Sequence, residues 1–314
     1  MTDNDLHIKL EKIALQSSIS AAIAAHKWVG KGDANSADAA AVDAMRKVLI
    51  GNNYFTGRVV IGEGERDEAP MLYIGETLGS GNSKCDIAVD PLEGTSLCAN
   101  GMINSMTTIA IGDNNSLLHA PDVYMEKIAC RENVDGIDIN LSIEENLDIV
   151  GFDLEKTASE ISVLVLDRPR HRELIQKIRD YGAKVKLISD GDISGVIRAT
   201  MNADIDLYIG SGGAPEGVLA ACALKVIGGT FQGKLVCDSP AKQERARKMG
   251  IVDFNKVYNI EDMVPGNVVF CMTGVTRGDL LDEIVYSDEH ILTHSLLFNS
   301  YNNTKQDIWF TQKA

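Results

Sequence analysis

The stretch Asp90-Pro91-Leu92-Glu93-Gly94-Thr95 is the most informative part of this sequence. It follows the apolar run 87–89, which is typical of a buried strand. Proline has no N–H to donate to a strand ladder, so we expect the strand to stop at Pro91 and Gly94 to permit a tight turn. Two carboxylates and a hydroxyl would then lie together at the end of one strand.

A second acidic stretch, Gly62-Glu63-Gly64-Glu65, follows the apolar run 59–61. Two groups of acids, each at a strand end and next to glycine, indicate a site for a hard cation. Oxygen ligands suit magnesium or manganese, and these ions suit phosphate chemistry. Asp38 lies near the start of a predicted helix, where it either complements the helix dipole or points into this cluster.

Composition narrows the class of protein. The 314 residues carry 30 Lys and Arg against 45 Asp and Glu, a net charge of −15. This charge argues against nucleic-acid partners and against binding to anionic membranes. A phosphate site would therefore need metal ions and a few local cations. We expect no secretory signal and no membrane span, and we expect free thiols in the cytoplasm from six scattered cysteines: Cys85, Cys98, Cys130, Cys222, Cys237 and Cys271.

The pattern of apolar residues predicts a mixed α/β protein. Helices are expected over 6–29 and 36–49, the second capped by Asn35 or Ser36, followed by strands between 58 and 111. Beyond residue 160, strands alternate with helices, which predicts a largely parallel sheet covered on both faces. We place a metal-binding half at 1–155 and a substrate-binding half at 156–314. The tail after about Tyr286 is less patterned, and we expect its stretch 302–306 to be loosely ordered.

The glycine-rich stretch 210–217 lies between a predicted strand, 205–209, and a helix ending near Ile227. Its backbone N–H groups could hold an anion at the helix N-terminus. It also loosely matches a dinucleotide fingerprint, with Asp238 near the place of the ribose-binding acid. Pro215 stands where the third glycine would be, which disfavours an oxidoreductase.

Three further motifs each have a structural and a functional interpretation. Arg168-Pro169-Arg170-His171 is either a solvated loop or a phosphate contact beyond a strand end. Asp190 and Asp192 either cap the next helix or accept hydrogen bonds from sugar hydroxyls. Tyr124 is either a core residue or a phenol that contacts phosphate.

Taken together, these motifs resemble a known family. Asp90–Thr95 resembles the metal motif of the lithium-sensitive phosphatase superfamily, which includes inositol monophosphatases and fructose bisphosphatases. Glu93, where most of that superfamily has Asp, is combined with 62–65 as in the class II fructose-1,6-bisphosphatases of bacteria. The match extends from about Leu10 to Asp282 through the stretches 30–33, 35–38, 67–76, 120–127, 169–171, 190–192 and 212–217.

The resemblance implies a set of site residues. Metal ligation of Mn²⁺ or Mg²⁺ is implied for Asp38, Glu63, Asp90, Glu93 and Glu216. Catalytic roles are implied for Asp38, Glu63, Asp90 and Thr95, with Thr95 and Asp38 positioning or deprotonating the attacking water. Substrate contacts are implied for Glu93, Gly94, Thr95, Tyr124, Arg168, Pro169, Arg170, Asp190, Gly191, Asp192 and Gly213.

The implied fold is a five-layer α/β/α/β/α sandwich in two halves, with the active site between them. The implied reaction is hydrolysis of the 1-phosphate of fructose 1,6-bisphosphate to fructose 6-phosphate and phosphate, by a homodimer or homotetramer. Alternative substrates are sedoheptulose 1,7-bisphosphate and an inositol phosphate. The chain departs from the family pattern at Arg168, where Lys is common, in a shorter segment after Lys234, and in its tail.

Overall fold

The computed structural model describes residues 3–64 and 71–313 and divides into two compact units. The first unit comprises the chain up to His119 together with Val264 onward, and the second runs from Ala120 to Met263. These units differ from the predicted halves 1–155 and 156–314 because the C-terminal strands pair back into the N-terminal sheet. The mixed α/β class is confirmed in each unit.

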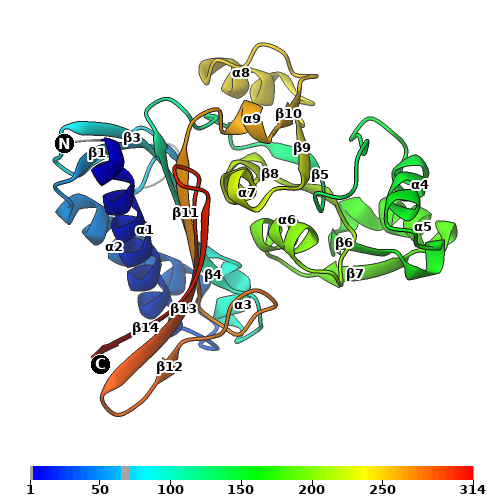
Figure 1. Cartoon of the computed structure of the whole chain (residues 1–314). Helices are drawn as coiled ribbons and strands as arrows, with labels where there is room; N and C mark the ends of the chain where they lie inside the picture. The colour runs from blue at the N-terminus through cyan, green and yellow to red at the C-terminus, as the bar shows by residue number, and fades with distance from the viewer. Residues whose placement is uncertain (1–2, 65–70, 314) are drawn as a thin grey trace. The chain divides into compact units, whose positions relative to one another are not determined.

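The first unit is built on an eight-stranded sheet in the order β12-β13-β11-β4-β3-β1-β2, with β14 paired to β13 (Figure 1). β1 and β3 are parallel, and the other pairs are antiparallel. Its elements are α1 (Asp3–His26), α2 (Ala34–Gly51), β1 (Phe55–Ile61), β2 (Thr77–Leu78), β3 (Ser83–Glu93), α3 (Thr95–Ala99), β4 (Met106–Asp113), β11 (Val268–Gly274), β12 (Val285–Tyr286), β13 (His290–Asn299) and β14 (Thr304–Lys313).

The helices α1 and α2 lie side by side against this sheet and bury a shared core with it (Figure 1). Buried alanines on both helices, among them Ala22 and Ala41, permit this close approach. The cap of α2 corrects the prediction: Asp33, rather than Asn35 or Ser36, accepts the Ser36 N–H at 3.0 Å and the Ser36 hydroxyl at 2.7 Å. A carboxylate on a free helix N–H stabilises the first turn.

The decisive stretch adopts a β-bulge, which also corrects the prediction. Asp90 pairs with Thr108 and Glu93 with Met106, so Pro91 and Leu92 together face one residue of β4. The strand therefore continues past the proline, because a bulge leaves a residue out of the ladder and tolerates its missing donor. Gly94 then takes φ 72°, a left-handed conformation that suits the predicted turn, and the short helix α3, which was not predicted, begins directly after it.

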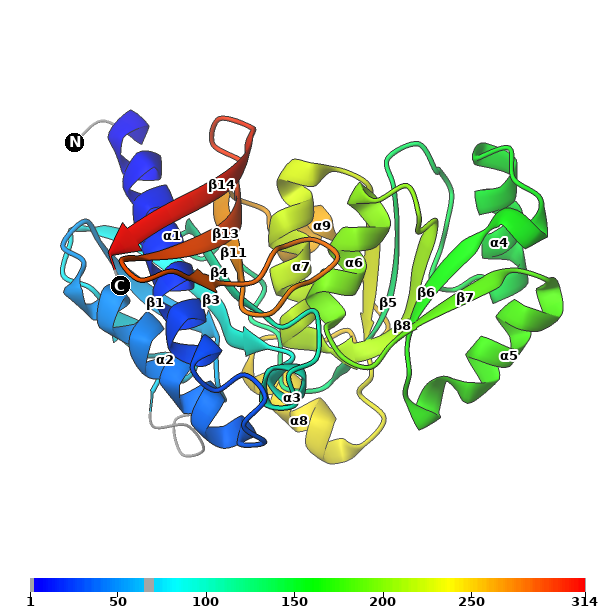
Figure 2. The ribbon, with the colours of Figure 1, turned by 90° about the horizontal axis from the view of Figure 1, so that it is seen from below.

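The second unit has a six-stranded sheet in the order β10-β9-β5-β8-β6-β7. Figure 2 shows α6 and α7 on one face of this sheet and α4 and α5 on the other. Its elements are β5 (Tyr124–Cys130), α4 (Ile143–Asp153), β6 (Ser162–Leu166), α5 (Arg172–Tyr181), β7 (Lys184–Ile188), α6 (Asp192–Met201), β8 (Leu207–Gly213), α7 (Ala214–Ile227), β9 (Thr230–Leu235), α8 (Pro240–Lys248), β10 (Val257–Asn259) and α9 (Ile260–Met263), with 3₁₀ turns at Ala158–Glu160 and Pro169–His171.

The prediction of a largely parallel sheet is wrong for this unit. β6 pairs in parallel with β7 and β8, as strand–helix–strand alternation requires. β5, however, comes from the start of the unit and inserts antiparallel between β8 and β9. A local pattern of strands and helices carries no signal for such an insertion, because the partners are far apart in sequence.

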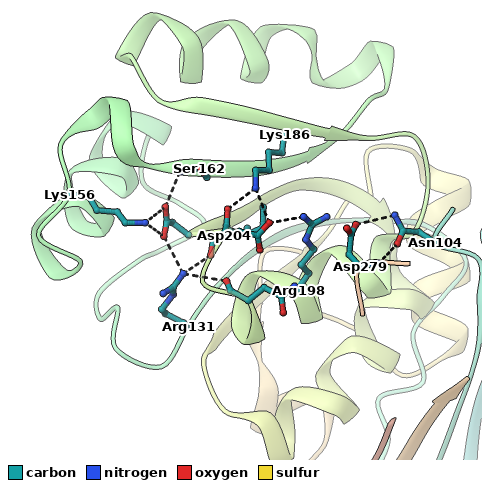
Figure 3. A network of polar contacts seen from close by, with 11 residues as sticks. Asn104, Arg131, Lys156, Ser162, Lys186, Arg198, Asp204 and Asp279 are labelled. Atoms are coloured by element: carbon teal, nitrogen blue, oxygen red, sulfur yellow. Dashed lines mark hydrogen bonds and ion pairs between the residues drawn. The ribbon is translucent and has the colours of Figure 1, made fainter. Parts of the chain in front are cut away.

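Two carboxylates, Asp204 and Asp206, anchor the second unit. Asp206 is fully buried and accepts hydrogen bonds from Lys156 at 2.6 Å and from the backbone of Ser162 at 2.9 Å. Lys186 and Arg198 both point to Asp204, each at 2.8 Å (Figure 3). These contacts fix the turn between α6 and β8 to the start of β6.

The prediction of a loosely ordered stretch at 302–306 is wrong as well. β13 and β14 form a hairpin that is paired without interruption from His290 and Lys313 to Asn299 and Thr304. Inward apolar residues of β13, such as Leu297, belong to the core under α1. No helix in the described part of the chain has the length and apolar character that crossing a bilayer requires.

Candidate functional site

The predicted acids of the first unit lie at the carboxyl ends of two adjacent parallel strands. Asp90 and Glu93 are near the end of β3, and Glu63 follows the end of β1. Parallel neighbours end at the same edge of a sheet, so these residues are brought to one place. Asp38 joins them from the second turn of α2. Glu65 and the stretch 67–70 lie outside the described residues.

Three of these carboxylates interact electrostatically, and this interaction contributes to raised pKa values. Burial, followed by the charges of Asp38 and Asp90, raises the pKa of Glu63 to about 8. Burial, followed by the charge of Asp90, raises the pKa of Asp38 to about 6. Like charges held together in a partly buried place favour the protonated forms. We call Asp38, Glu63 and Asp90 the acidic cluster.

The acidic cluster fits a divalent cation by its ligand type and by its charge. Partly buried carboxylates that repel one another are relieved by a hard cation, and all three offer oxygen. Among residues 3–64 and 71–313, however, no group of three or more His, Cys, Asp or Glu side chains is arranged closely enough to hold a metal ion as it stands. The carboxylates would have to draw together around the ion.

The bulge positions the groups next to the acidic cluster. Asp90 accepts the Leu92 N–H at 3.1 Å, which fixes its carboxylate against the turn. Thr95 donates its hydroxyl proton to the Leu92 carbonyl at 2.9 Å, so its oxygen remains an acceptor. Glu93 is buried with 5% exposure, and its carbonyl accepts the Ser105 hydroxyl.

The predicted substrate residues of the second unit also meet at one sheet edge. Arg168 and Arg170 follow β6, Asp190–Asp192 follow β7, and Gly213 ends β8. These three strands are parallel neighbours, so their carboxyl ends coincide. Tyr124 begins β5 and pairs antiparallel with Gly213, which brings it to the same edge. We call Tyr124, Arg168, Arg170, Asp190 and Gly213 the arginine edge.

Both arginines of this edge are held in place by backbone carbonyls. Arg170 donates from Nε to the Ser211 carbonyl at 3.1 Å, and its guanidinium lies 4.6 Å from the centre of the Tyr124 ring. Arg168 donates to the Ser189 carbonyl and pairs with Asp190 at 3.2 Å. Stacking and backbone contacts leave a guanidinium pre-oriented toward an anionic ligand.

His171 is a structural residue rather than a third cation. It is buried, its Nδ1 lies 2.7 Å from the Leu166 carbonyl, and its Nε2 accepts the Ser211 N–H at 2.8 Å. An accepting Nε2 requires the neutral ring with its proton on Nδ1. Burial also lowers the pKa of His171. The ring therefore supports the Ser211 backbone that Arg170 contacts.

The glycine-rich stretch has a different geometry from the one predicted. Gly210–Gly213 lie within β8, paired to β5, instead of forming a loop. A Cβ on Gly212 would overlap the Asp192 carboxylate, and one on Gly213 would overlap the Glu216 carboxylate. These glycines therefore give room to two acids, and the dinucleotide interpretation loses its phosphate-binding loop.

Sequence reasoning missed two residues that join this edge from inside. Lys127 donates to Asp192 and, at 2.6 Å, to the Gly213 carbonyl, while Tyr208 donates its hydroxyl to Asp192. Both side chains are buried. The available signal was a lysine in a strand that is otherwise apolar from 127 to 130, and a solvated strand face would explain Lys127 and the preceding Glu126 equally well.

Comparisons with known proteins agree with these motifs. The sequence model of a family described as bacterial fructose-1,6-bisphosphatase, glpX-encoded, matches residues 9–311. Proteins named D-fructose 1,6-bisphosphatase class 2/sedoheptulose 1,7-bisphosphatase are similar to the chain. The protein of Crocosphaera subtropica is 44% identical, covering 90% of each chain. That of Synechocystis is 42% identical, covering 96% of this chain and 94% of its own.

Proposed function

The chain belongs to the family of bacterial, glpX-encoded fructose-1,6-bisphosphatases and is a phosphatase of that class, and we propose that it removes the 1-phosphate of fructose 1,6-bisphosphate with Mg²⁺ or Mn²⁺. The observation that carries this proposal is the acidic cluster at the carboxyl ends of β1 and β3, where burial and the neighbouring carboxylates raise the pKa of Glu63 and of Asp38.

We propose that Asp38, Glu63, Asp90 and Glu93 hold the metal ions, together with Glu216 from the start of α7. A divalent cation bound there would polarise the phosphate and lower the pKa of a coordinated water. The first turn of α7 places Glu216 against Gly213, and its carboxylate lies where a side chain at Gly213 would be.

Thr95 orients the attacking water in this proposal. Its hydroxyl proton is directed to the Leu92 carbonyl, so the oxygen can accept a hydrogen bond from water. Asp38 assists Thr95 in positioning or deprotonating that water. Little covalent chemistry is required of the protein, because positioning and electrostatics dominate phosphoryl transfer.

The arginine edge binds the sugar and its remaining phosphate. Arg168, Pro169 and Arg170 present two pre-oriented guanidinium groups, and Tyr124 stacks on one of them. Asp190 and Gly191 face the sugar hydroxyls, and Glu93, Gly94 and Thr95 contact the phosphate that leaves. Binding of a remote phosphate selects a bisphosphate over a monophosphate.

The dual name of the relatives favours sedoheptulose 1,7-bisphosphate as a second substrate. Phosphate release from metal-stripped protein, with and without Mn²⁺ or Mg²⁺, tests the whole proposal. Fructose 1,6-bisphosphate, sedoheptulose 1,7-bisphosphate, fructose 1-phosphate and inositol 1-phosphate are compared in parallel. Metal-dependent release that favours the two bisphosphates is expected. Absence of release from all four esters, with metal bound, would refute the assignment.

Self-association through β14 completes the proposal. No further strand pairs with the outer edge of β14 among residues 3–64 and 71–313. Ten residues long and without a bulge, it carries exposed Trp309 and Phe310. A long edge strand leaves backbone N–H and C=O groups unpaired, and with exposed aromatic side chains it is a template for pairing with another chain. Antiparallel self-pairing centred on Phe310 would place Asp307 opposite Lys313 of a second copy, which makes the edge complementary to itself.

The cell compartment that fits these properties is the cytoplasm. All six cysteines are free, and five of them are buried. Burial raises the pKa of Cys85, Cys130 and Cys271 to about 12, so these thiols stay protonated and unreactive.

A further inference from the structure

Lys127 is a charged residue in the interior of the second unit. It lies in β5 and is 1% exposed, which lysines reach only when they are paired. Its Nζ donates to the Asp192 carboxylate and to the Gly213 carbonyl, the latter at 2.6 Å. Its stem passes α7 at Gly217, where a Cβ would stand 3.1 Å from Lys127 Cε.

Asp192 is committed to the same interior network. It is 7% exposed, one carboxylate oxygen accepts from Lys127, and the other accepts from the Tyr208 hydroxyl. Both oxygens are therefore used from inside the unit. These contacts favour Asp192 as an anchor for the start of α6, with Asp190 as the partly exposed acid of the same loop.

The network joins three segments that reach the arginine edge. Asp192 begins α6 directly after Gly191, which has φ 93°, and Gly213 joins β8 to α7. Lys127 stands three residues into β5 from Tyr124. The Lys127 ammonium group thus fixes the Gly191 turn relative to the Gly213 carbonyl. It also neutralises the charge of Asp192, which lies next to that turn and that carbonyl.

We propose that Lys127 is a positioning residue for the bisphosphate, and that it keeps the charge of Asp192 from opposing substrate binding. The inference rests on the proposed function. A substrate with two phosphates meets a protein of net charge −15, so an additional uncompensated carboxylate beside Gly213 would weaken its binding. Loss of the Lys127 contacts would also displace the turns at Gly191 and Gly213. This displacement would weaken substrate binding too, because binding depends on the geometry of both turns.

Lys127→Met tests the role, since methionine has a similar length without charge. We expect KM for fructose 1,6-bisphosphate to rise about 10- to 100-fold, with a smaller change in kcat. The rise in KM should be larger for fructose 1,6-bisphosphate than for fructose 1-phosphate, which carries one phosphate fewer. A merely structural residue would not distinguish the two esters. A KM within about twofold of wild type, for folded protein, would overturn the proposal.

The double variant Lys127→Met/Asp192→Asn separates charge from geometry. It buries no unpaired charge, so it should fold even where the single variant does not. Recovery of at least part of the lost affinity is expected, because the opposing carboxylate is gone. Affinity for the bisphosphate equal to or worse than that of Lys127→Met would refute the charge role.

Tyr208→Phe is the matched control, because it removes one hydrogen bond from Asp192 and leaves every charge in place. Its KM should stay within about threefold of wild type. Inactivity of the wild-type protein toward all sugar phosphates would refute the proposed function. Active wild type with variants of unchanged KM would refute the role of Lys127 alone.

Discussion

The carboxylate of Asp192 lies against the backbone of Gly212, in the space that a side chain at that position would occupy. Gly212→Ala should therefore push Asp192 away from Lys127 and Tyr208. We expect a loss of about 1–3 kcal/mol in the free energy of unfolding and a higher KM for the bisphosphate. Denaturant unfolding and steady-state kinetics measure both. Gly51→Ala is the control, because its Cβ would meet open space, and an equal effect there would contradict the explanation.

Asp90 is predicted to be essential for turnover and dispensable for folding. Asp90→Asn keeps an oxygen that can accept the Leu92 N–H and removes the charge. We expect kcat to fall by about 10²–10³-fold or more, because metal binding and charge stabilisation are lost together. Removal of a like charge should also lower the pKa of Glu63, which carboxyl NMR of metal-free protein can follow.

The control for that variant is Asp43→Asn on the exposed face of α2, where the carboxylate pairs with Lys47 at 2.5 Å. Its activity should equal that of wild type. Activity of Asp90→Asn near that of Asp43→Asn would remove Asp90 from the metal ligands.

The positions of the segments that hold the candidate site residues were predicted from the sequence better than the pairing of the strands. The end of β1 and the start of α7 at Pro215 follow from local signals, namely apolar runs, glycine and proline. The bulge at Pro91, the insertion of β5 and the β13–β14 hairpin do not. Each depends on antiparallel partners in distant parts of the chain, and strand preference depends on such tertiary context.

The site shows the same contrast. Residues at strand ends, such as Arg168 and Asp190, were predicted, and the structure pairs them at 3.2 Å. The anchors beneath them, Lys127 and Tyr208, were not. A buried lysine resembles a solvated one in sequence, because burial and ion pairing are properties of the assembled core.

The acidic cluster makes the stability of the metal-free protein depend on pH. Folding raises the pKa of Glu63 from 4.5 to about 8 and that of Asp38 from 3.8 to about 6. At pH values between the unfolded and the folded pKa of each group, the folded state holds more protons than the unfolded state. The free energy of unfolding should therefore fall as pH rises from about 4 to 8. Urea unfolding at several pH values, without metal, measures this slope.

Saturating Mg²⁺ or Mn²⁺ should remove most of that slope, because the ion replaces the protons and stabilises the folded state. Glu63→Gln should flatten the metal-free profile, since glutamine imitates the protonated carboxyl. A metal-free protein whose stability rises through this pH range would contradict the arrangement of the cluster.

Arg170 is predicted to act on the affinity for the distal phosphate. Arg170→Ala removes the guanidinium that contacts the Ser211 carbonyl and stacks on Tyr124. We expect KM for fructose 1,6-bisphosphate to rise about tenfold or more, with kcat changed less. KM for fructose 1-phosphate should stay nearly constant, because that ester lacks the second phosphate. Arg172→Ala, at the exposed start of α5, is the control, and similar KM shifts for both variants would exclude a specific role of Arg170.

The outer edge of β14 is predicted to form the contact between two copies of the chain. In the register centred on Phe310, this residue faces its own copy, so Phe310→Lys would set two lysines opposite each other. Like charges directly opposite destabilise a strand pair, and we expect the dissociation constant of the dimer to rise at least about tenfold. Sedimentation equilibrium across a range of concentrations measures it. Phe152→Lys is the control, because Phe152 is 84% exposed on α4 of the other unit. A wild-type chain that is monomeric at every concentration, or equal weakening by both variants, would exclude β14 as the interface.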